Sequence, residues 1–465
     1  MGKSTNSLSL VAVPPIRDFY FSPQRLSWLG AQAFVERLSQ TEKNLSLCVA
    51  PTNTASITQV SLPSYFNYLK PFLHLPLPKE FSFFKGFYQL GGSPKEFAKT
   101  VAAKNPKKVY ISNFAYSYSD DAIAFAKEIK KLLPDVKLII GGAGTSVHPD
   151  YFKQTSLFDA IQIDDPTDKL PTLLSTIRLN KNEVKLVTIL SKGCPRSCNF
   201  CSNHLTQGKR FNHIDEQQLI ALLKRKKREL DDKNLVCKQF DIEDDNLLLD
   251  KAFFFFAIEA IHRFFPTATI LFENGLDYML LEEKDIDFLK QYNVNQLNLA
   301  LASATSKTLI NLERTSNIDK LLRLSNYAYK LSISPIIYFI CGTKYDSPSH
   351  IIDAFNFIKE AKALPGISLF YPVPKLLHFE ELSQFKYGES HKTLSAAAYP
   401  WSNNLSTKTM VSAFILSRIF YHHQKSTYFK SKKTSSEIAN IGPSFFENLG
   451  LDMELIYRFF NSKII

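Results

Sequence analysis

The chain has 465 residues, a formal net charge of +12 at pH 7 and six cysteines. This length is sufficient for two or three domains with ample apolar core. No apolar run reaches the roughly 18 residues of a membrane-spanning helix, and the N-terminus lacks the pattern of a signal peptide. The cysteines are unevenly spaced, unlike those of a secreted disulfide framework. We therefore expect a cytoplasmic protein without a membrane partner.

The positive charge is concentrated in two runs, residues 224–228 on a predicted helix and residues 425–433 near the C-terminus. Such runs are more often solvated helix faces than binding surfaces, and neither contains a nucleic-acid reader motif. A nucleic-acid partner therefore stays open but is not favoured.

The N-terminal third alternates short apolar strands with amphipathic helices. This alternation predicts a parallel sheet covered on both faces, with ligands beyond the carboxyl ends of its strands. Residues 51–93 are rich in Pro and Phe and are interpreted as a packed insertion rather than a flexible linker. The strands are expected at 8–13, 45–50, 109–112, 136–140 and 160–163, and the helices at 27–38, 95–103, 120–132 and 168–177.

A glycine-rich turn follows the expected strand at 136–140. It contains Gly141, Gly142 and Gly144, followed by Thr145, in a chain that has only 16 glycines. The average glycine content of about 7% would give about twice that number. Glycine permits backbone conformations and close approaches that other residues avoid. The turn therefore marks either a ligand lying close to the backbone or an ordinary chain reversal after a strand.

Three of the six cysteines lie within eight residues, as Cys194-x3-Cys198-x2-Cys201, directly after an apolar strand expected at 184–190. Three thiolates on one loop can hold a metal or a cluster, because each loses its proton on ligation. A cubane iron–sulfur cluster normally takes four thiolates, so three leave one iron open. Two alternatives remain, a Cys3His zinc site completed by His204 and a chance grouping of buried cysteines.

From residue 184 onward, strands and helices alternate again. Six such units resemble an open (βα)6 barrel, in which chemistry is expected at the carboxyl ends of the strands, where the cysteine loop lies. The aromatic and basic tail from about 378 is expected to cap it and to help form a substrate pocket. The strands are expected at 184–190, 239–242, 269–272, 296–300, 335–340 and 367–371, and the helices at 215–230, 250–265, 283–292, 305–312, 318–331 and 349–362.

The cysteine spacing, with Phe200 before the third cysteine, resembles the signature of the radical S-adenosylmethionine (radical SAM) superfamily. The resemblance implies a 4Fe–4S cluster on Cys194, Cys198 and Cys201, and S-adenosylmethionine bound to the open iron. One electron, from a donor such as flavodoxin or ferredoxin, then yields a 5′-deoxyadenosyl radical in that family. The three cysteines are thus the expected catalytic and metal-binding residues, and Phe200 an expected cofactor contact.

The segment from Lys130 to Thr145, with its glycine turn, resembles the cobalamin-binding domain that precedes the radical domain in a large class of these enzymes. The residues that this resemblance assigns to cofactor binding are Ser112, Gly141, Gly142, Gly144 and Thr145. None of the ten histidines lies in the D-x-H-x-x-G pattern that supplies a lower axial imidazole in many cobalamin proteins. Any cobalamin would therefore be held without a histidine in that motif.

The acidic segment after the expected strand at 239–242 is similar to one that faces S-adenosylmethionine in this class. Asp244 or Asp245 would accept hydrogen bonds from the ammonium group of the cofactor. The alternative is an acidic turn and helix N-cap, a position that Asp and Asn favour.

The fourth strand and the helix after it place Ser303 and Arg314 where relatives contact the ribose or carboxylate of the cofactor. Relatives usually carry Gly and Glu where this chain has Ala300 and Ala302. The missing carboxylate puts the polar contacts of this strand in doubt. Ser303 could instead be a loop residue, and Arg314 a charge on a helix surface. Cys341, after the fifth strand, is expected to be a buried apolar residue rather than a fourth ligand.

The fold class is therefore α/β, with a Rossmann-like (flavodoxin-like) cobalamin-binding domain, a partial (βα)6 radical SAM barrel and a small C-terminal cap. The expected boundaries are 1–180, 181–377 and 378–465. The resemblance implies a cobalamin-dependent enzyme that methylates an unactivated carbon of a small-molecule or peptide substrate. The alternatives are a ring-forming, rearranging or tRNA-modifying radical SAM enzyme, or a non-catalytic metal-binding relative. The sequence does not identify the substrate or the oligomeric state.

Overall fold

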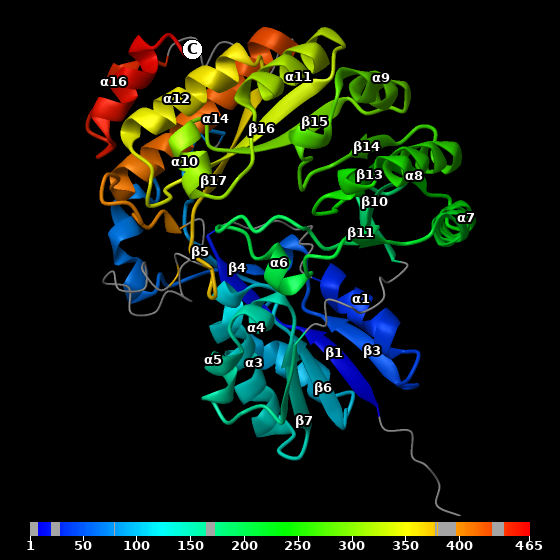
Figure 1. The fold of residues 1–465 in the computed structure, drawn as a ribbon. Helices are drawn as coiled ribbons and strands as arrows, with labels where there is room; N and C mark the ends of the chain where they lie inside the picture. The colour runs from blue at the N-terminus through cyan, green and yellow to red at the C-terminus, as the bar shows by residue number, and fades with distance from the viewer. Residues whose placement is uncertain are drawn as a thin grey trace, which may run out of the picture.

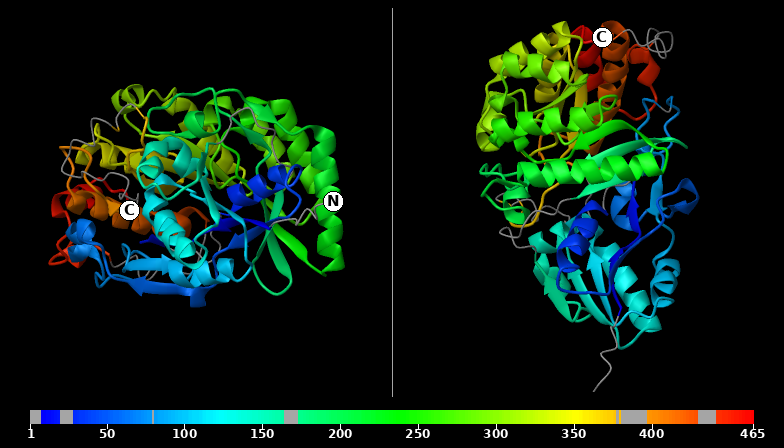
Figure 2. Two further views of the ribbon diagram at one scale, coloured as in Figure 1. Left: turned by 90° about the horizontal axis from the view of Figure 1, so that it is seen from below. Right: turned by 90° about the vertical axis from the view of Figure 1, so that its right-hand side faces the viewer.

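The computed structural model contains two α/β units that lie one above the other (Figure 1; Figure 2). It describes residues 8–19, 28–78, 80–163, 173–376, 379, 397–429 and 441–465. The sheet of the N-terminal unit is drawn in blue and cyan, and the sheets of the second unit in green and yellow.

A five-stranded parallel sheet forms the centre of the N-terminal unit, in the order β3-β1-β6-β7-β8. Numbered within the sheet, this order is 2-1-3-4-5, the flavodoxin-like arrangement, whose ligands bind where the strand order reverses. Leu10 and Ala12 pack with α2 and α3, whereas Val11 and Val13 pack with α1 on the opposite face. The elements are β1 (Ser9–Val13), β3 (Leu45–Val49), β6 (Lys108–Ser112), β7 (Lys137–Gly141), β8 (Ala160–Gln162), α1 (Leu29–Leu38), α2 (Pro94–Ala102) and α3 (Ser119–Leu132).

Six parallel strands, each followed by at least one helix, build the second unit. They form the sheets β10-β13-β14 and β15-β16-β17, which an isolated parallel bridge between Leu276 and Leu299 connects. All six strands and six helices expected from the sequence are present. They are β10 (Glu183–Thr188), β13 (Val236–Ile242), β14 (Thr269–Leu271), β15 (Gln296–Ala302), β16 (Ser334–Cys341), β17 (Leu364–Leu369), α7 (Glu216–Asp232), α8 (Lys251–Phe264), α9 (Glu283–Gln291), α10 (Ser306–Asn311), α11 (Ile318–Lys330) and α12 (Pro348–Glu360).

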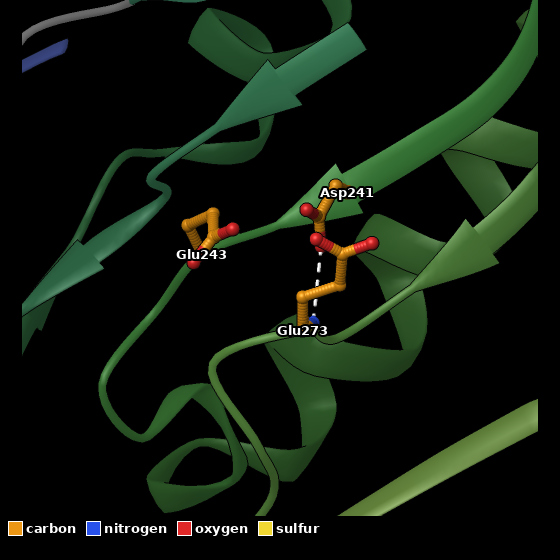
Figure 3. A group of neighbouring side chains, drawn as sticks. All are labelled: Asp241, Glu243 and Glu273. Carbon is orange, nitrogen blue, oxygen red and sulfur yellow. Dashed lines mark hydrogen bonds between the residues drawn. The ribbon is translucent and has the colours of Figure 1, made fainter. Parts of the chain in front are cut away.

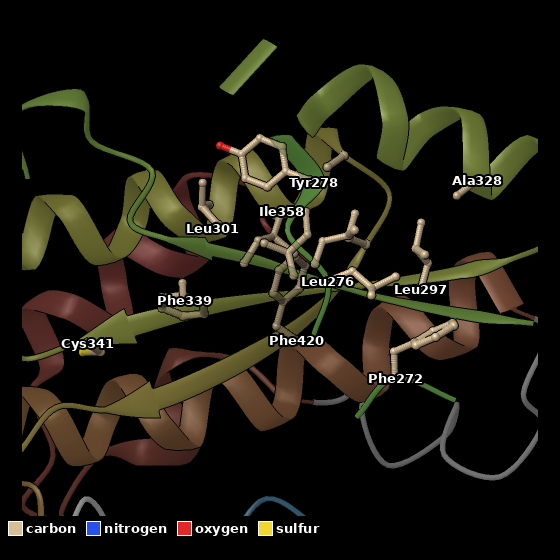
Figure 4. Packing of buried hydrophobic residues seen from close by; sticks show 14 of the residues in the cluster. Phe272, Leu276, Tyr278, Leu297, Leu301, Ala328, Phe339, Cys341, Ile358 and Phe420 are labelled. Carbon is tan, nitrogen blue, oxygen red and sulfur yellow. The ribbon is translucent and has the colours of Figure 1, made fainter. Parts of the chain in front are cut away.

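One continuous apolar core holds these strands against their helices. Figure 4 shows Leu297 of β15 and Phe339 of β16 gathered with Ile358 of α12 and Phe420 of α14 (Thr407–Phe429). Cys341 is 1% exposed within this core. It is therefore the buried apolar residue that the sequence predicted, and burial raises the pKa of its thiol well above the usual value.

The insertion at residues 51–93 is packed, as predicted, but it also contains strands that the sequence analysis missed. Strands β4 (Ile57–Val60) and β5 (Phe87–Leu90) join β2 (Ile16–Asp18) in an antiparallel sheet. Phe83 meets Phe414 of α14 edge-on, with ring centroids 5.4 Å apart. The short strands lack a clear apolar alternation, so only their pairing defines them.

The helix predicted at 168–177 is wrong over its last part, because Leu174–Arg178 forms strand β9. This strand pairs antiparallel with β10, and Leu174 and Ile177 are buried. Residues 168–172 lie outside the described part of the chain. Pairing with the edge of β10 decides the conformation, which local helical spacing alone could not reveal.

The C-terminal tail contributes helices to the second unit. Helix α14 lies against β17 and α12, and α16 (Met453–Asn461) packs on the same core through Leu455 and Phe459. Within the described residues, no helix combines the length and the apolar character that crossing a membrane requires.

Candidate functional site

The cysteine loop lies between the two strands of a short hairpin that follows β10. Strand β11 (Ser191–Lys192) pairs with β12 (Asn212–His213), and the backbone N–H of Cys194 donates to the carbonyl of Gly208 at 3.0 Å. Gly193 has φ +87°, and a Cβ there would lie 2.1 Å from the carbonyl oxygen of Arg210. Glycine is therefore required for the hairpin to pack against the start of the loop.

The three thiols of the loop are free of disulfides. Cys198 is 4% exposed, and Cys194 and Cys201 are half-buried. Burial raises the pKa of Cys194, and raises that of Cys201 to about 11. Thiolates at such positions need a bound cation to stabilise their charge. Phe200 is half-buried in the turn before Cys201.

The spacing of the sulfur atoms bears on the zinc alternative. Among the described residues, only one trio of Asp, Glu, Cys or His side chains has all its ligand atoms within 4.8 Å of one another. That trio contains no cysteine. A single tetrahedral zinc, with Zn–S bonds of about 2.3 Å, would hold its sulfurs about 3.8 Å apart. In addition, the His204 side chain hydrogen-bonds the backbone of Cys201. Metal analysis of the purified protein decides between zinc and a cluster.

Contacts from the fourth βα unit and from the turn after β14 anchor the loop. The side-chain amide of Asn199 donates to the Asn311 carbonyl at 2.7 Å, and the Asn199 backbone N–H donates to the Leu312 carbonyl at 3.3 Å. Arg196 forms an ion pair with Asp277, with 2.5 Å between Nη2 and Oδ2. Sequence reasoning missed these residues because their partners are distant in the chain.

Asp244 is hydrogen-bonded to the backbone that leads into the cysteine loop. It is 5% exposed, and its carboxylate oxygens accept the backbone N–H groups of Leu190 and Ser191 at 2.9 and 2.5 Å, and also the Ser191 hydroxyl. Burial raises its pKa to about 7 despite these hydrogen bonds. Asp244 therefore fixes the chain that leads into the cysteine loop.

Asp245 lies closer to the cysteine loop. Its carboxylate contacts Asn203 and accepts from the side chain of Asn274 at 3.4 Å, while burial raises its pKa. Its charge also acts on the thiol of Cys201. Of the two neighbouring aspartates, Asp245 is therefore the one positioned to meet a polar ligand beside the cysteines.

The end of β15 is irregular. A break in register separates Ala300 from Ala302, and Ala302 has φ +71°, a conformation that residues with a Cβ rarely adopt. The Ser303 hydroxyl accepts the backbone N–H of Thr305 at 3.2 Å. Arg314 donates to the Ala300 carbonyl at 3.1 Å, so it supports the bulge rather than lying on a helix surface.

Several buried polar atoms around the loop have no hydrogen-bond partner. They are Asn199 Oδ1, Asn246 Oδ1 and Arg314 Nε, two acceptors and one donor. Buried polar groups are rarely left unpaired in proteins unless a ligand or water completes them. Together with three thiols on one loop, they fit a thiolate-bound cluster that carries a polar organic ligand.

A cavity of about 520 Å³ separates the two units beside this loop. On one side it is lined by residues at the carboxyl edge of the N-terminal sheet. On the opposite side it is lined by residues at or after the ends of strands in the second unit. Residues from the first group are Ser112, Gly141 and Gly142, and from the second group Thr188, Lys192, Gln207, Glu243 and Asn274. Gly144 and Thr145 are not part of this lining.

The glycines of the turn are required by the protein's own packing. A Cβ on Gly142, which has φ +102°, would lie 2.7 Å from the Asn113 carbonyl oxygen, and one on Gly144 would lie 2.3 Å from the Ala115 carbonyl carbon. Thr145 donates its hydroxyl hydrogen to the Gly141 carbonyl at 3.3 Å. The turn therefore presents backbone to the cavity, but neither Gly142 nor Gly144 is needed to make room for a ligand's bulk.

An acidic group that the sequence analysis missed lies at the wall of this cavity. Figure 3 shows Asp241, Glu243 and Glu273 at the ends of β13 and β14. Lys185 contacts Asp241 and Glu273 at 2.7 Å each. Burial, followed by the charge of Asp241, raises the pKa of Glu243 to about 8. Glu243 therefore holds its proton more tightly than an ordinary glutamate, and it lines the cavity.

Comparisons with known proteins agree with this architecture. Residues 188–358 match the radical SAM superfamily. Bacteriochlorophyllide d C-12(1)-methyltransferase of Chlorobaculum tepidum is 24% identical over 243 residues, which span 50% of each chain. This chain thus matches about half the length of that curated relative.

Two solved structures of a radical S-adenosylmethionine methyltransferase, TsrM from Kitasatospora setae, share the fold. The structure with tryptophan substrate and an S-adenosylmethionine analogue has a TM-score of 0.54 at 12% identity, covering 82% of this chain and 77% of that one. The structure with cobalamin and a 4Fe–4S cluster also has a TM-score of 0.54 at 12% identity, covering 82% and 76%. The α/β class with parallel sheets is therefore confirmed.

Proposed function

Because residues 188–358 form a radical SAM domain, we propose that this chain is a cobalamin-dependent radical SAM enzyme that methylates an unactivated carbon. The six consecutive βα units support an open (βα)6 barrel. The 2-1-3-4-5 strand order supports a cobalamin-binding domain before it. The proposed boundaries remain 1–180, 181–377 and 378–465, with the last segment as a C-terminal cap.

The cavity between the two carboxyl edges is the observation that carries this proposal. In α/β sheets and barrels, ligands and catalytic groups lie at these edges, and here the two edges face each other across one space. Ser112, Gly141 and Gly142 would hold cobalamin from the N-terminal side, with Lys192 and Gln207, which flank the cysteine loop in sequence, also lining the cavity. Gly144 and Thr145 would support that side from behind, because the cavity does not reach them.

When bound, the cluster and S-adenosylmethionine supply a one-electron cleavage that generates a carbon radical, and cobalamin supplies a transferable methyl group. The protein's own part is to hold and orient. Cys194, Cys198 and Cys201 would bind the cluster. Asp245 would accept hydrogen bonds from an ammonium group beside it, since its carboxylate acts on Cys201.

Other residues of the domain would position the rest of the cofactor. The unpartnered Nε of Arg314 is a donor for a carboxylate, and Ser303 and Phe200 lie at positions expected to contact the ribose or adenosyl part. Glu243 would share a proton with Asp241 at the wall of the cavity, which keeps one carboxyl group there from ionising fully. An electron donor such as a flavodoxin or ferredoxin, a small-molecule or peptide substrate and a cytoplasmic location complete the proposal.

No specific observation favours the rival functions. Two lysines of the basic run on α7 pair with acidic residues of the same helix, Lys226 with Glu229 at 2.6 Å and Lys227 with Asp231 at 2.5 Å. This pairing weakens the argument for a tRNA substrate. Ring formation or rearrangement would use the same residues and is distinguished by its products.

The experiment is anaerobic purification, reconstitution and product analysis. We expect about four irons per chain, retention of added hydroxocobalamin through desalting, and 5′-deoxyadenosine release with a strong reductant. Methyl-labelled S-adenosylmethionine should label a carbon of the true substrate, and the substrates named for the relatives, tryptophan and a bacteriochlorophyllide, are the first to try. Stoichiometric zinc without iron would refute the proposal, and iron without cobalamin would limit it to the radical domain.

A further inference from the structure

The segment that follows β17, the last strand of the second unit, contacts the N-terminal unit at two points. Tyr116, which is 2% exposed, donates its hydroxyl hydrogen to the carbonyl of Pro372. Lys375 donates from Nζ to the carbonyl of Ser146 at 2.8 Å. None of these four residues is assigned above to cofactor binding, and the two bonds join residues that are 256 and 229 positions apart in the chain.

Each of the two contacts leads to a glycine of the turn. Ser146 belongs to the short helix α4 (Ala143–Val147), and its backbone N–H donates to the Gly142 carbonyl at 3.0 Å. A Cβ on Gly144 would lie 2.5 Å from the backbone nitrogen of Tyr116. One contact therefore acts through Tyr116 on Gly144, and the other acts through Ser146 on Gly142, which lines the cavity.

The contacting segment is itself fixed to the second unit. The backbone N–H of Phe370 donates to the Cys341 carbonyl, at the end of β16, at 2.9 Å. The ring of Tyr371 stacks on that of Tyr116, with centroids 6.0 Å apart and planes at 27°. Lys375 has φ +67°, a conformation that residues with a Cβ rarely adopt. Because such backbone strain persists only where the surrounding structure holds it, the segment has a definite conformation rather than that of a loose connection.

We infer that residues 370–376 form a clamp that positions the glycine turn against the second unit through Tyr116 and Lys375. These two are positioning residues and not cofactor contacts. Helix α6 (Asn203–Thr206), directly after the third cysteine, also lies against α4 (Figure 1), so the clamp holds the turn beside the segment that leaves the cysteine loop. The clamp would thereby keep the turn in the conformation that binds cobalamin, and in naming this ligand the inference rests on the proposed function.

The test compares Tyr116→Phe and Lys375→Met with Tyr68→Phe. The first two variants each remove one bond of the clamp and keep most of the side chain, including the stacked ring of Tyr116. Tyr68 donates its hydroxyl hydrogen to the Ala397 carbonyl at 2.9 Å, so Tyr68→Phe controls for loss of a bond between a tyrosine and a distant carbonyl elsewhere in the chain. Hydrogen–deuterium exchange of the full chain as purified measures opening of the turn, in peptides that cover residues 141–147. Because Lys375 is exposed, Lys375→Met should fold even if Tyr116→Phe does not.

Loss of one net hydrogen bond should speed exchange in the peptides of the turn about two- to tenfold in Tyr116→Phe and in Lys375→Met. Tyr68→Phe should exchange there like the wild type. Exchange of the turn that is unchanged in both clamp variants, or accelerated equally in all three proteins, would overturn the inference.

The double variant of Tyr116 and Lys375 tests what the clamp does for the cofactor. Its affinity for hydroxocobalamin should fall about two- to tenfold with iron content unchanged, because a binding conformation that is only partly populated lowers the apparent affinity in proportion. Wild-type affinity in the double variant would overturn the part of the clamp in positioning the cofactor. Wild-type protein that retains no hydroxocobalamin would instead refute the proposed cobalamin site, and the exchange comparison would still decide whether the clamp exists.

Discussion

The neighbouring residues Asp244 and Asp245 should fail in different ways when each is replaced by alanine. Asp244→Ala removes the acceptor of two backbone N–H groups, those of Leu190 and Ser191. Each buried donor left unpaired costs about 1–3 kcal/mol. The free energy of unfolding of the cluster-free protein should therefore fall by about 2–6 kcal/mol.

Asp245→Ala should cost less stability than Asp244→Ala, because this carboxylate contacts the side chains of Asn203 and Asn274, the second at 3.4 Å, rather than buried backbone N–H groups. On the proposed function, it should instead weaken S-adenosylmethionine binding about tenfold to a hundredfold, the equivalent of about 1.5–3 kcal/mol for a charged hydrogen bond. Asp244→Asn keeps one acceptor oxygen and should recover part of the stability lost in Asp244→Ala.

Urea unfolding followed by circular dichroism measures the first effect, and calorimetric titration of the reconstituted protein with S-adenosylmethionine measures the second. Equal stability of the two alanine variants, with the loss of affinity confined to Asp244→Ala, would refute the assignment of roles. Asp244 would then be the better candidate for the S-adenosylmethionine contact that the sequence predicted.

Three further predictions concern the cluster, the cavity and the acidic group. Replacing Cys194, Cys198 and Cys201 together by alanine should abolish the visible absorption of the reconstituted protein, and a spectrum that persists would place the cluster elsewhere. Ser112→Phe should fill part of the cavity and reduce cobalamin retention without loss of iron, and full retention would argue against this site. Gly144→Ala should instead destabilise the fold, because its Cβ would lie 2.3 Å from the Ala115 carbonyl carbon. The pKa of Glu243 is raised in the folded protein from 4.5 to about 8. Between pH 4.5 and about 8 the native state therefore binds more protons than the unfolded state, so the stability of the protein should fall as the pH rises through this range. Glu243→Gln should flatten this dependence of the melting temperature, and an identical slope in both proteins would contradict the raised pKa.

Local patterns in the sequence were sufficient for much of the architecture. Cys194, Cys198 and Cys201 lie within one loop, so their spacing alone brings the thiols together wherever the loop is placed. The six βα units were predictable because apolar periodicity reports which face of each element is buried. The glycine turn was recognised from the scarcity of glycine, and Cys341 from its place in an apolar strand.

Tertiary structure decided the features that depend on partners distant in the chain. Leu174–Arg178 is a strand because the edge of β10 is available to it, and Asp244 faces Leu190 and Ser191 rather than the loop because the chain turns after β13. Gly142 and Gly144 are required by the close approach of Asn113 and Ala115, which are distant from the turn in sequence. Arg196 and Asp277 meet only when separate βα units fold together. Ion pairs and hydrogen bonds between distant residues leave no periodic signal in a sequence, because any polar residue in the same position would preserve the local pattern.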